Sequence, residues 1–493
     1  MIYMQKRWSS HFLWITMVTY SVVMVLISLN RHYTFRTNAF DMGIFMQSLW
    51  STVHGDFMYN TVEWFVFCAP NHFGIHLSPV LAVLAPLYGL LPYAETLLVV
   101  QTVAIALSAY PLYLLAERII GESKIALALV VMYLGNSLVH GINSYDFHAV
   151  PFAMPFIFLV ALMIERRKYG LAVLSALGVL SVREDAGIAL IALGLFYLLR
   201  NRKLFRVSTY VSIIRALESG TLDELERMSF VFIAMGTVWI LLGWVVVDSS
   251  HLASFYGGLL SGCNIPMKAV YFLVASATLG MLTFLKPKYF LLLTALPWTE
   301  ILLSCEKNLY RVGFQYPYML VPLSMIAIIY ALEEIPSDRR GRTVLAALAL
   351  GIFVSAATSP ILPGENGLMG ILEIPANYYV PVTGHDRMLT DITRALAPTD
   401  FSVLTQNDVF PHLANRENTY VIWASYCGRT LPRTDIVLLD WTLTYADYNF
   451  LVGDLLSGYT VIYKRDGVEV WVRNDLIGTW EVENLQRVLE GIQ

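Results

Sequence analysis

The sequence contains little charge. Only 14% of its 493 residues are Asp, Glu, Lys or Arg, whereas about 25% is typical of a soluble domain, and 57% are hydrophobic. No stretch combines many Lys and Arg residues with interleaved aromatics, so nucleic acid is not an expected partner. The first apolar run lacks a small-residue cleavage site, which predicts an uncleaved helix instead of a signal peptide. The composition therefore predicts an integral membrane protein.

Apolar runs of membrane-spanning length recur from about residue 12 to about residue 360. Eleven spans are expected, at about 12–30, 95–116, 125–141, 149–164, 169–182, 186–200, 228–247, 268–285, 289–304, 317–333 and 343–360. The stretch 77–92 is short for a span and contains three prolines, so we expect it to be re-entrant or interfacial.

Basic residues near the run ends predict the orientation. The positive-inside rule assigns to the cytoplasm the Lys and Arg residues at 6–7, 118–124, 166–168, 200–206, 286–288 and 339–342. In the cell membrane the N-terminus is then cytoplasmic, and the outer side receives 31–94, 141–150, 182–187, 248–266, 305–318 and everything after about 361. Residues 201–227 on the inner side predict an amphipathic helix on the membrane surface.

Cysteine is also scarce. Under this topology all four cysteines, Cys68, Cys263, Cys305 and Cys427, fall on the outer side, where one or two disulfides can form. Four unpaired cysteines in apolar surroundings are the alternative. No CxxC spacing is present, so the pattern does not indicate a cysteine metal site.

The last 130 or so residues differ in pattern from the rest of the chain. After the turn-forming stretch 359–367, short alternating segments predict strands at 401–407, 419–424, 435–440 and 459–474, the last a hairpin turning at Asp466-Gly467. Helices are expected at about 385–397 and 478–490. The predicted fold class is an α-helical polytopic membrane protein, residues 1–360, with a small α/β extracytoplasmic C-terminal domain, residues 361–493.

The first outer loop carries three candidate residue groups. Asp41, in "RTNAFDMGIF", could deprotonate a hydroxyl or bind a divalent cation, and the alternative is a helix N-cap. His72 and His76 in "NHFGIH" are four residues apart, a spacing seen in metal sites, with Glu63 as a third ligand. Hydrogen bonding at the surface is the alternative for the two histidines.

The loop "YDFH" (145–148) offers half of a divalent-metal site. Asp146 and His148 are two residues apart, so in an extended loop they face the same way. A simple turn before Pro151 is equally compatible with the pattern.

Two further outer loops carry residues suited to substrate binding. In "VREDAG" (182–187), Arg183 could bind a phosphate, and the loop could instead anchor the membrane end of a span. The segment 308–322 offers contacts for an anion or a sugar, or an interfacial aromatic belt. The candidate substrate-binding residues are Glu63, Arg183, Glu184, Asp185, Arg311, Gln315 and Tyr316.

Several blocks resemble a known family. "FDMGIFMQSLW", "NHFGIHLSPVLAVLAPLYGLLP", "GINSYDFHAV", "VREDAG", "YRVGFQYPYMLVP" and "LTQNDVFPHLANR" are similar to the multi-pass membrane family catalogued as domain of unknown function 2079, over about residues 35–475. That family in turn resembles the C-type glycosyltransferases, which take sugar from polyprenyl-phosphate or polyprenyl-diphosphate carriers.

The resemblance implies roles for matching residues. Asp41 would be the catalytic acid residue of the first outer loop, and Asp41, Asp146 and His148 would hold a divalent metal, Mg or Mn before Zn. The sequence departs from the glycosyltransferase pattern in two ways. It has no WWDYG-like motif, since "YADYNF" (445–450) is not one, and Asp41 has no second acid beside it.

These observations favour a membrane glycosyltransferase that transfers sugar from a polyprenyl-phosphate-linked donor to an acceptor on the outer face. A transporter or flippase of lipid-linked sugars is the first alternative, but it needs a polar path across the bilayer, which the charge-poor spans do not show. A non-catalytic scaffold for envelope assembly is the second. The expected partners are the lipid-linked sugar and membrane lipids, and the pattern assigns neither the donor sugar, the acceptor nor the oligomeric state.

Overall fold

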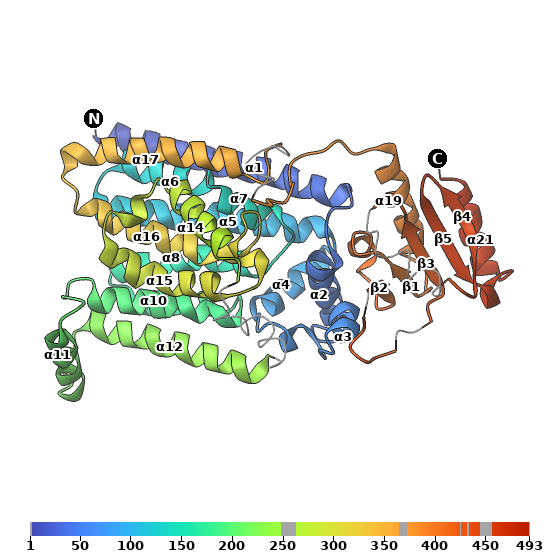
Figure 1. The fold of residues 1–493 in the computed structure, drawn as a ribbon, viewed down its shortest axis with the longest axis horizontal. Coiled ribbons are helices and arrows are strands. Elements are labelled where there is room, and N and C mark those ends of the chain that lie inside the picture. Colours follow the sequence, from blue (N-terminus) through green and yellow to red (C-terminus); the bar gives the residue numbers. More distant parts are fainter. Residues whose placement is uncertain are drawn as a thin grey trace.

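The chain forms a long helical part with a small sheet domain at one end (Figure 1). A computed structural model describes residues 2–247, 263–363, 372–423, 425–430, 433–443 and 456–492. The helices before the sheet domain are α1 (Ile2–Tyr33), α2 (Ile44–His54), α3 (Thr61–Val66), α4 (Val80–Leu90), α5 (Ala94–Ile120), α6 (Ser123–Leu134), α7 (Ser137–Ser144), α8 (Ala153–Glu165), α9 (Tyr169–Leu180), α10 (Gly187–Leu199), α11 (Val207–Glu218), α12 (Glu224–Val246), α14 (Ile265–Thr278), α15 (Pro287–Leu303), α16 (Leu320–Glu333) and α17 (Ser337–Thr358).

The apolar runs are helical, as predicted, but they differ in length. Within the described residues, five helices are long and apolar enough to cross a membrane: Ser9–Tyr33, Ala94–Ile120, Glu224–Val246, Tyr316–Glu333 and Ser337–Thr358. The bent pair α6 and α7, which meet at 50°, makes six if it forms one broken span. Other runs form helices shorter than the roughly 20 residues that a span needs, such as α8 and α9. The structure thus supports a helical membrane protein with several spans and does not confirm eleven.

The stretch 77–92 forms the short helix α4. Its 11 residues reach about 16 Å at 1.5 Å per residue, roughly half of the hydrocarbon thickness of a bilayer. α4 packs against α2, so both belong to the compact first outer loop. α11 lies at the opposite end from the sheet domain (Figure 1), and it exposes Val207, Tyr210, Val211, Ile214 and Leu217. The last residues of the predicted surface helix 201–227 belong to α12, which begins at Glu224.

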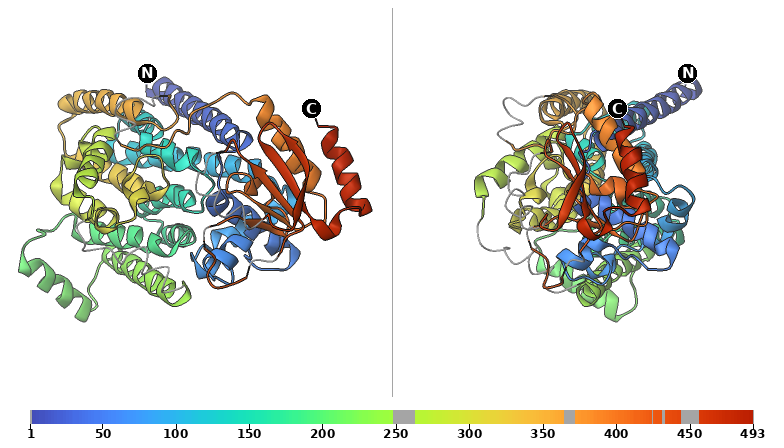
Figure 2. Two further views of the ribbon diagram at one scale, coloured as in Figure 1. Left: turned by 45° about the vertical axis from the view of Figure 1, so that its right-hand side comes forward. Right: turned by 90° about the vertical axis from the view of Figure 1, so that its right-hand side faces the viewer.

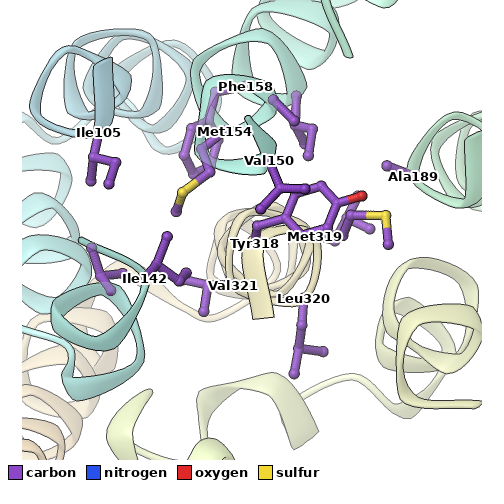
Figure 3. Close-up of a cluster of buried hydrophobic side chains, with 14 of the residues drawn as sticks. Ile105, Ile142, Val150, Met154, Phe158, Ala189, Tyr318, Met319, Leu320 and Val321 are labelled. Carbon is purple, nitrogen blue, oxygen red and sulfur yellow. The ribbon is translucent and has the colours of Figure 1, made fainter. Parts of the chain in front are cut away.

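The core of the helical part surrounds the start of α16. Figure 3 shows Tyr318, Met319, Leu320 and Val321 among side chains from α5, α7, α8 and α10. Each of these four residues is at most 2% exposed. The Tyr318 hydroxyl donates a hydrogen bond to Asp185 Oδ1 at 2.8 Å. The core therefore extends to the segment 182–187, where Tyr318 fixes the Asp185 carboxylate.

The C-terminal domain is a mixed sheet covered by two helices, which confirms the predicted small sheet domain. Its strands are β1 (Val403–Thr405), β2 (Thr419–Val421), β3 (Ile436–Asp440), β4 (Tyr459–Arg465) and β5 (Val468–Arg473), in the order β2-β1-β3-β5-β4. β1 is parallel to β2 and β3, and the β4–β5 hairpin is antiparallel. Asp466 and Gly467 make its turn with φ of 46° and 82°, as the Asp-Gly pair predicts.

Helices α19 (Gly384–Leu396) and α21 (Trp480–Glu490) pack together over one side of this sheet, as Figure 2 shows from the end of the molecule. Leu389, Ile392 and Leu485 belong to one buried apolar cluster with Ile436 and Val470 of the sheet. α19 begins with a capping box at Thr383 and Asp386, which satisfies the first free backbone N–H groups of the helix.

The sheet domain is docked tightly on the first outer loop. Asn407 accepts the backbone N–H of Ala39 at its side-chain oxygen, 3.0 Å away, and donates to the side-chain oxygen of Asn38 at 2.9 Å. A Cβ on Gly43 would lie 2.5 Å from the ring of the fully buried Phe410, so only glycine allows this approach.

Two disulfides connect segments that are expected on the outer side. Cys68 of the first outer loop pairs with Cys427 of the sheet domain, and Cys263 pairs with Cys305. Both bonds agree with the prediction that the four cysteines share a compartment that permits disulfides.

Gly43→Ala should loosen this docking. The added methyl group meets the Phe410 ring, and overpacking a filled core costs about 1–3 kcal/mol, so the thermal unfolding midpoint of the purified protein in detergent should fall. Gly170→Ala in α9, where a Cβ has open space, is the matched control and should leave the midpoint unchanged or raise it. Equal midpoints for Gly43→Ala and the wild type would contradict the close contact.

Candidate functional site

A cavity of about 200 Å³ lies where four segments that are expected on the outer side meet. Polar side chains from four separate segments line it, and they include eight of the residues expected from the sequence: Asp41, Glu63, His72, His76, His148, Arg183, Gln315 and Tyr316. Phe40, Ile44, Phe45 and Phe67 provide apolar wall. The structure therefore brings together side chains that are up to 275 residues apart in sequence, the separation of Asp41 and Tyr316. All the lining residues precede the sheet domain.

Asp41 and His148 form the first of three histidine–carboxylate pairs. Asp41 lies in η1 (Ala39–Gly43), a single turn of π-helix of the kind often found at functional sites. Its Oδ1 is 3.0 Å from Nε2 of His148, and the Asp41 side chain is 21% exposed. The backbone N–H of His148 donates to Gln101 Oε1 at 2.7 Å, which fixes the loop.

The neighbours of His148 determine where its protons lie. Its Nδ1 is 3.1 Å from the carbonyl oxygen of Asp146, and a carbonyl oxygen can only accept, so Nδ1 carries a hydrogen. One further proton must then lie between Nε2 and Asp41, either as imidazolium with carboxylate or as imidazole with carboxylic acid. The pair is a proton-holding group at the cavity wall.

Glu63 and His72 form the second pair, and both are almost fully buried. Glu63 Oε1 is 2.8 Å from His72 Nδ1, and its Oε2 accepts from the Asn60 amide at 2.6 Å. Burial is the largest influence and raises the pKa of Glu63, but His72 and Asn60 together lower the pKa below its ordinary value. Glu63 is thus a carboxylate that accepts from Nδ1–H of His72.

His76 and Glu184 form the third pair, 3.0 Å apart. The second oxygen of Glu184 accepts the backbone N–H of Leu77 at 3.0 Å. Burial raises the pKa of Glu184, but His76 and then Arg183 outweigh it and lower the pKa to about 2. Glu184 lies behind His76 and fixes that ring at the cavity wall.

Arg183 is the cation of the site, and Asp185 compensates its charge. Its Nε donates to Asp185 Oδ1 at 2.7 Å, and its Nη2 donates to the second carboxylate oxygen. The guanidinium also lies 5.8 Å from the centre of the Tyr316 ring, within range of a cation–π contact. Asp185 therefore orients Arg183 and does not itself line the cavity.

The residues expected to bind metal do not form one ligand set in this arrangement. The fully buried Asp146 carboxylate turns to Arg31 Nε at 3.2 Å, and its other oxygen accepts from the backbone and side-chain nitrogens of Asn38 at 2.8 and 3.0 Å. His72, His76 and His148 each face a different carboxylate. In the described part of the chain, no three His, Cys, Asp or Glu side chains gather as a metal site. A metal at Asp41 stays a prediction.

Other residues lie elsewhere or were missed. Arg311 pairs with Glu373 in the segment before the sheet domain and does not line the cavity. Arg31, Asn38 and Gln101 organise the site but were not among the candidates. Arg31 had a signal, because the expected topology places it on the outer side, against the positive-inside rule, where it would need a partner.

A comparison with known families finds a match over most of the chain. Residues 31–470 match the family described as predicted membrane protein (DUF2079). The chain belongs to this family. The matched region contains every cavity residue and most of the sheet domain, and it supports a membrane location. No curated protein matches the sequence.

The Glu184 ion pair predicts a specific acid sensitivity. Because the pKa of Glu184 is lowered in the folded protein, its stabilisation is present above the ordinary pKa of about 4.5 and is lost as the pH falls toward about 2. Unfolding midpoints in detergent between pH 5 and about 2 should fall less steeply for Glu184→Gln than for the wild type. Glu417→Gln, at an exposed position, should behave like the wild type. Equal slopes for Glu184→Gln and Glu417→Gln would refute the pairing.

Proposed function

We propose that this protein is a membrane glycosyltransferase that uses a polyprenyl-phosphate-linked sugar at the outer face of the membrane. The observation that carries the proposal is the Asp41–His148 pair in the wall of a cavity whose segments are all expected on the outer side. The resemblance to the C-type glycosyltransferases suggests the donor class.

The expected topology places the cavity at the height where such a lipid presents its sugar. With eleven spans and a cytoplasmic N-terminus, the end that carries the sheet domain faces outward. The two disulfides support this orientation, because both join segments at that end and need an oxidising compartment. α4 exposes Val83, Leu87 and Leu90 beside the first outer loop, and this apolar face could guide the isoprenoid chain.

The chemistry follows from the pair. The acceptor oxygen forms a bond to the anomeric carbon while the bond from that carbon to the phosphate oxygen breaks. The acceptor proton passes to the Asp41 carboxylate, and the polyprenyl phosphate leaves with the electron pair. His148 donates its Nδ1 hydrogen to the Asp146 carbonyl and orients the Asp41 carboxylate through Nε2. Arg183 lines the same cavity and supplies positive charge toward the departing phosphate.

Asp41→Asn should remove most of the transfer activity while the protein still folds. Loss of a positioned general base lowers rates by roughly 10²–10⁴-fold. The measurement is transfer from radiolabelled polyprenyl-phosphate sugars in membranes of a deletion strain that carries each variant at equal protein level. Asp56→Asn, an exposed carboxylate in the same outer loop, is the matched control and should keep wild-type activity.

The two rival functions predict different results. A scaffold should tolerate Asp41→Asn fully, and a lipid flippase should show translocation of the lipid-linked sugar without any transfer product in the wild type. Wild-type transfer rates in Asp41→Asn membranes would overturn the role of Asp41.

A further inference from the structure

Among the described residues, two buried polar atoms that belong to cavity-lining residues have no hydrogen-bond partner. They are Nε2 of His72 and Oε1 of Gln315, and their residues are 2% and 6% exposed. Both residues line the same cavity of about 200 Å³. A buried polar atom without a partner costs about 1–3 kcal/mol, so such atoms are rare unless a ligand or water completes them. Their convergence on one cavity points to a ligand.

The two atoms have complementary requirements. Since Glu63 accepts from Nδ1–H of His72, Nε2 carries a lone pair when the ring is neutral and a hydrogen when it is charged. A hydroxyl group can donate a hydrogen bond to the lone pair of Nε2 when the ring is neutral. It can accept a hydrogen bond from Nε2–H when the ring is charged, so it satisfies Nε2 in both states. Oε1 of Gln315 is an acceptor and needs a donor, which a hydroxyl also provides.

We propose that His72 and Gln315 bind two hydroxyl groups of the sugar ring of the donor, and so determine which sugar the protein accepts. This inference rests on the proposed function. It places the sugar ring beside His72 and Gln315, and the phosphate beside Arg183 in the wall of the same cavity.

The surroundings favour a neutral polyol over an anion. The Gln315 side-chain oxygen accepts hydrogen bonds, and the Glu63 carboxylate lies behind His72. Both groups would repel a phosphate placed between Gln315 and His72. The cavity is also smaller than the roughly 300–1,000 Å³ that drug-sized ligands occupy, which leaves room for one sugar ring and excludes the whole lipid.

The hydroxyl-binding atoms are close to the reacting pair. The Phe45 ring contacts the His72 ring at 5.1 Å between centroids and the His148 ring at 5.7 Å. The Phe45 ring therefore contacts both His72, one of the two proposed sugar contacts, and the pair that holds the proton. A sugar bound to His72 and Gln315 would lie within reach of Asp41.

The test measures binding, not transfer. The purified full chain in detergent is titrated with polyprenyl-phosphate-linked glucose, galactose, mannose and arabinose. The sugar that binds is then compared with its single-deoxy analogues. In the wild type, deletion of two particular hydroxyl groups should each weaken binding about tenfold, because each deletion leaves one protein atom without its partner.

The variants assign each hydroxyl group to its residue. Gln315→Met removes the acceptor at nearly constant volume and should abolish the penalty of one deoxy analogue only. Glu63→Met combined with His72→Phe replaces the buried pair with apolar groups, which avoids an uncompensated buried charge, and should abolish the other penalty only. Gln486→Met, in α21 of the sheet domain and outside the cavity lining, is the control and should retain both penalties.

The outcomes separate this inference from the proposed function. If both penalties persist in both variants, or if none of the four sugars binds, the inference is overturned even when Asp41→Asn abolishes transfer. If the penalties disappear as expected while Asp41→Asn transfers at the wild-type rate, the sugar site stands and the catalytic role of Asp41 falls.

Discussion

The buried carboxylate of Asp146 is the interaction on which the site depends. It joins three segments, because Arg31 ends the first span, Asn38 precedes Asp41, and Asp146 itself precedes His148. A fully buried carboxylate is tolerated only when it is paired and hydrogen-bonded, and here each oxygen has partners. Removing one partner would leave an uncompensated buried charge, which typically costs 3–5 kcal/mol. The Asp146 carboxylate thus links the segment that carries Asp41 to the loop that carries His148, and its role as a metal ligand stays a prediction.

The sheet domain adds hydrogen bonds to this network. Asn407 bonds to the same short segment that carries Asn38 and Asp41, and Phe410 closes over Gly43. The disulfide from Cys68 to Cys427 ties the far end of the loop to the same domain. The domain lines none of the cavity, yet it holds the loop that supplies Asp41, Glu63, His72 and His76. It therefore acts on the site by positioning the loop.

Hydropathy and alternation predicted most of the fold because each depends on local pattern. The apolar runs became helices, and the Asp466-Gly467 hairpin formed where a dipeptide that tolerates positive φ stood between alternating residues. The number of spans was harder to predict. Helices such as α8 and α9 are apolar throughout but short, and pattern cannot say whether a short helix crosses a bilayer.

The gathering of the site residues was predictable, but their pairing was not. The topology placed the polar loops together, and Asp41 and His148 do meet. However, His76 pairs with Glu184, 108 residues away, and Asp146 turns to Arg31. Which carboxylate compensates which cation depends on side-chain directions that follow from tertiary packing. A pair such as Asp146-x-His148 suggested one shared ligand site, yet the carboxylate and the ring point to different partners.

The central claim is that positions 41 and 148 lie side by side in a cavity that opens to the outside of the cell. The most direct test cross-links cysteines at these two positions with a reagent added from outside. A variant that combines Asp41→Cys with His148→Cys is treated in intact cells with a short, membrane-impermeant bifunctional thiol reagent, and the native cysteines do not interfere because both pairs are in disulfides. The account predicts an intramolecular cross-link between the peptides that contain positions 41 and 148, detected by mass spectrometry. Labelling only after permeabilisation, or single labelling at each position without a cross-link, would contradict it.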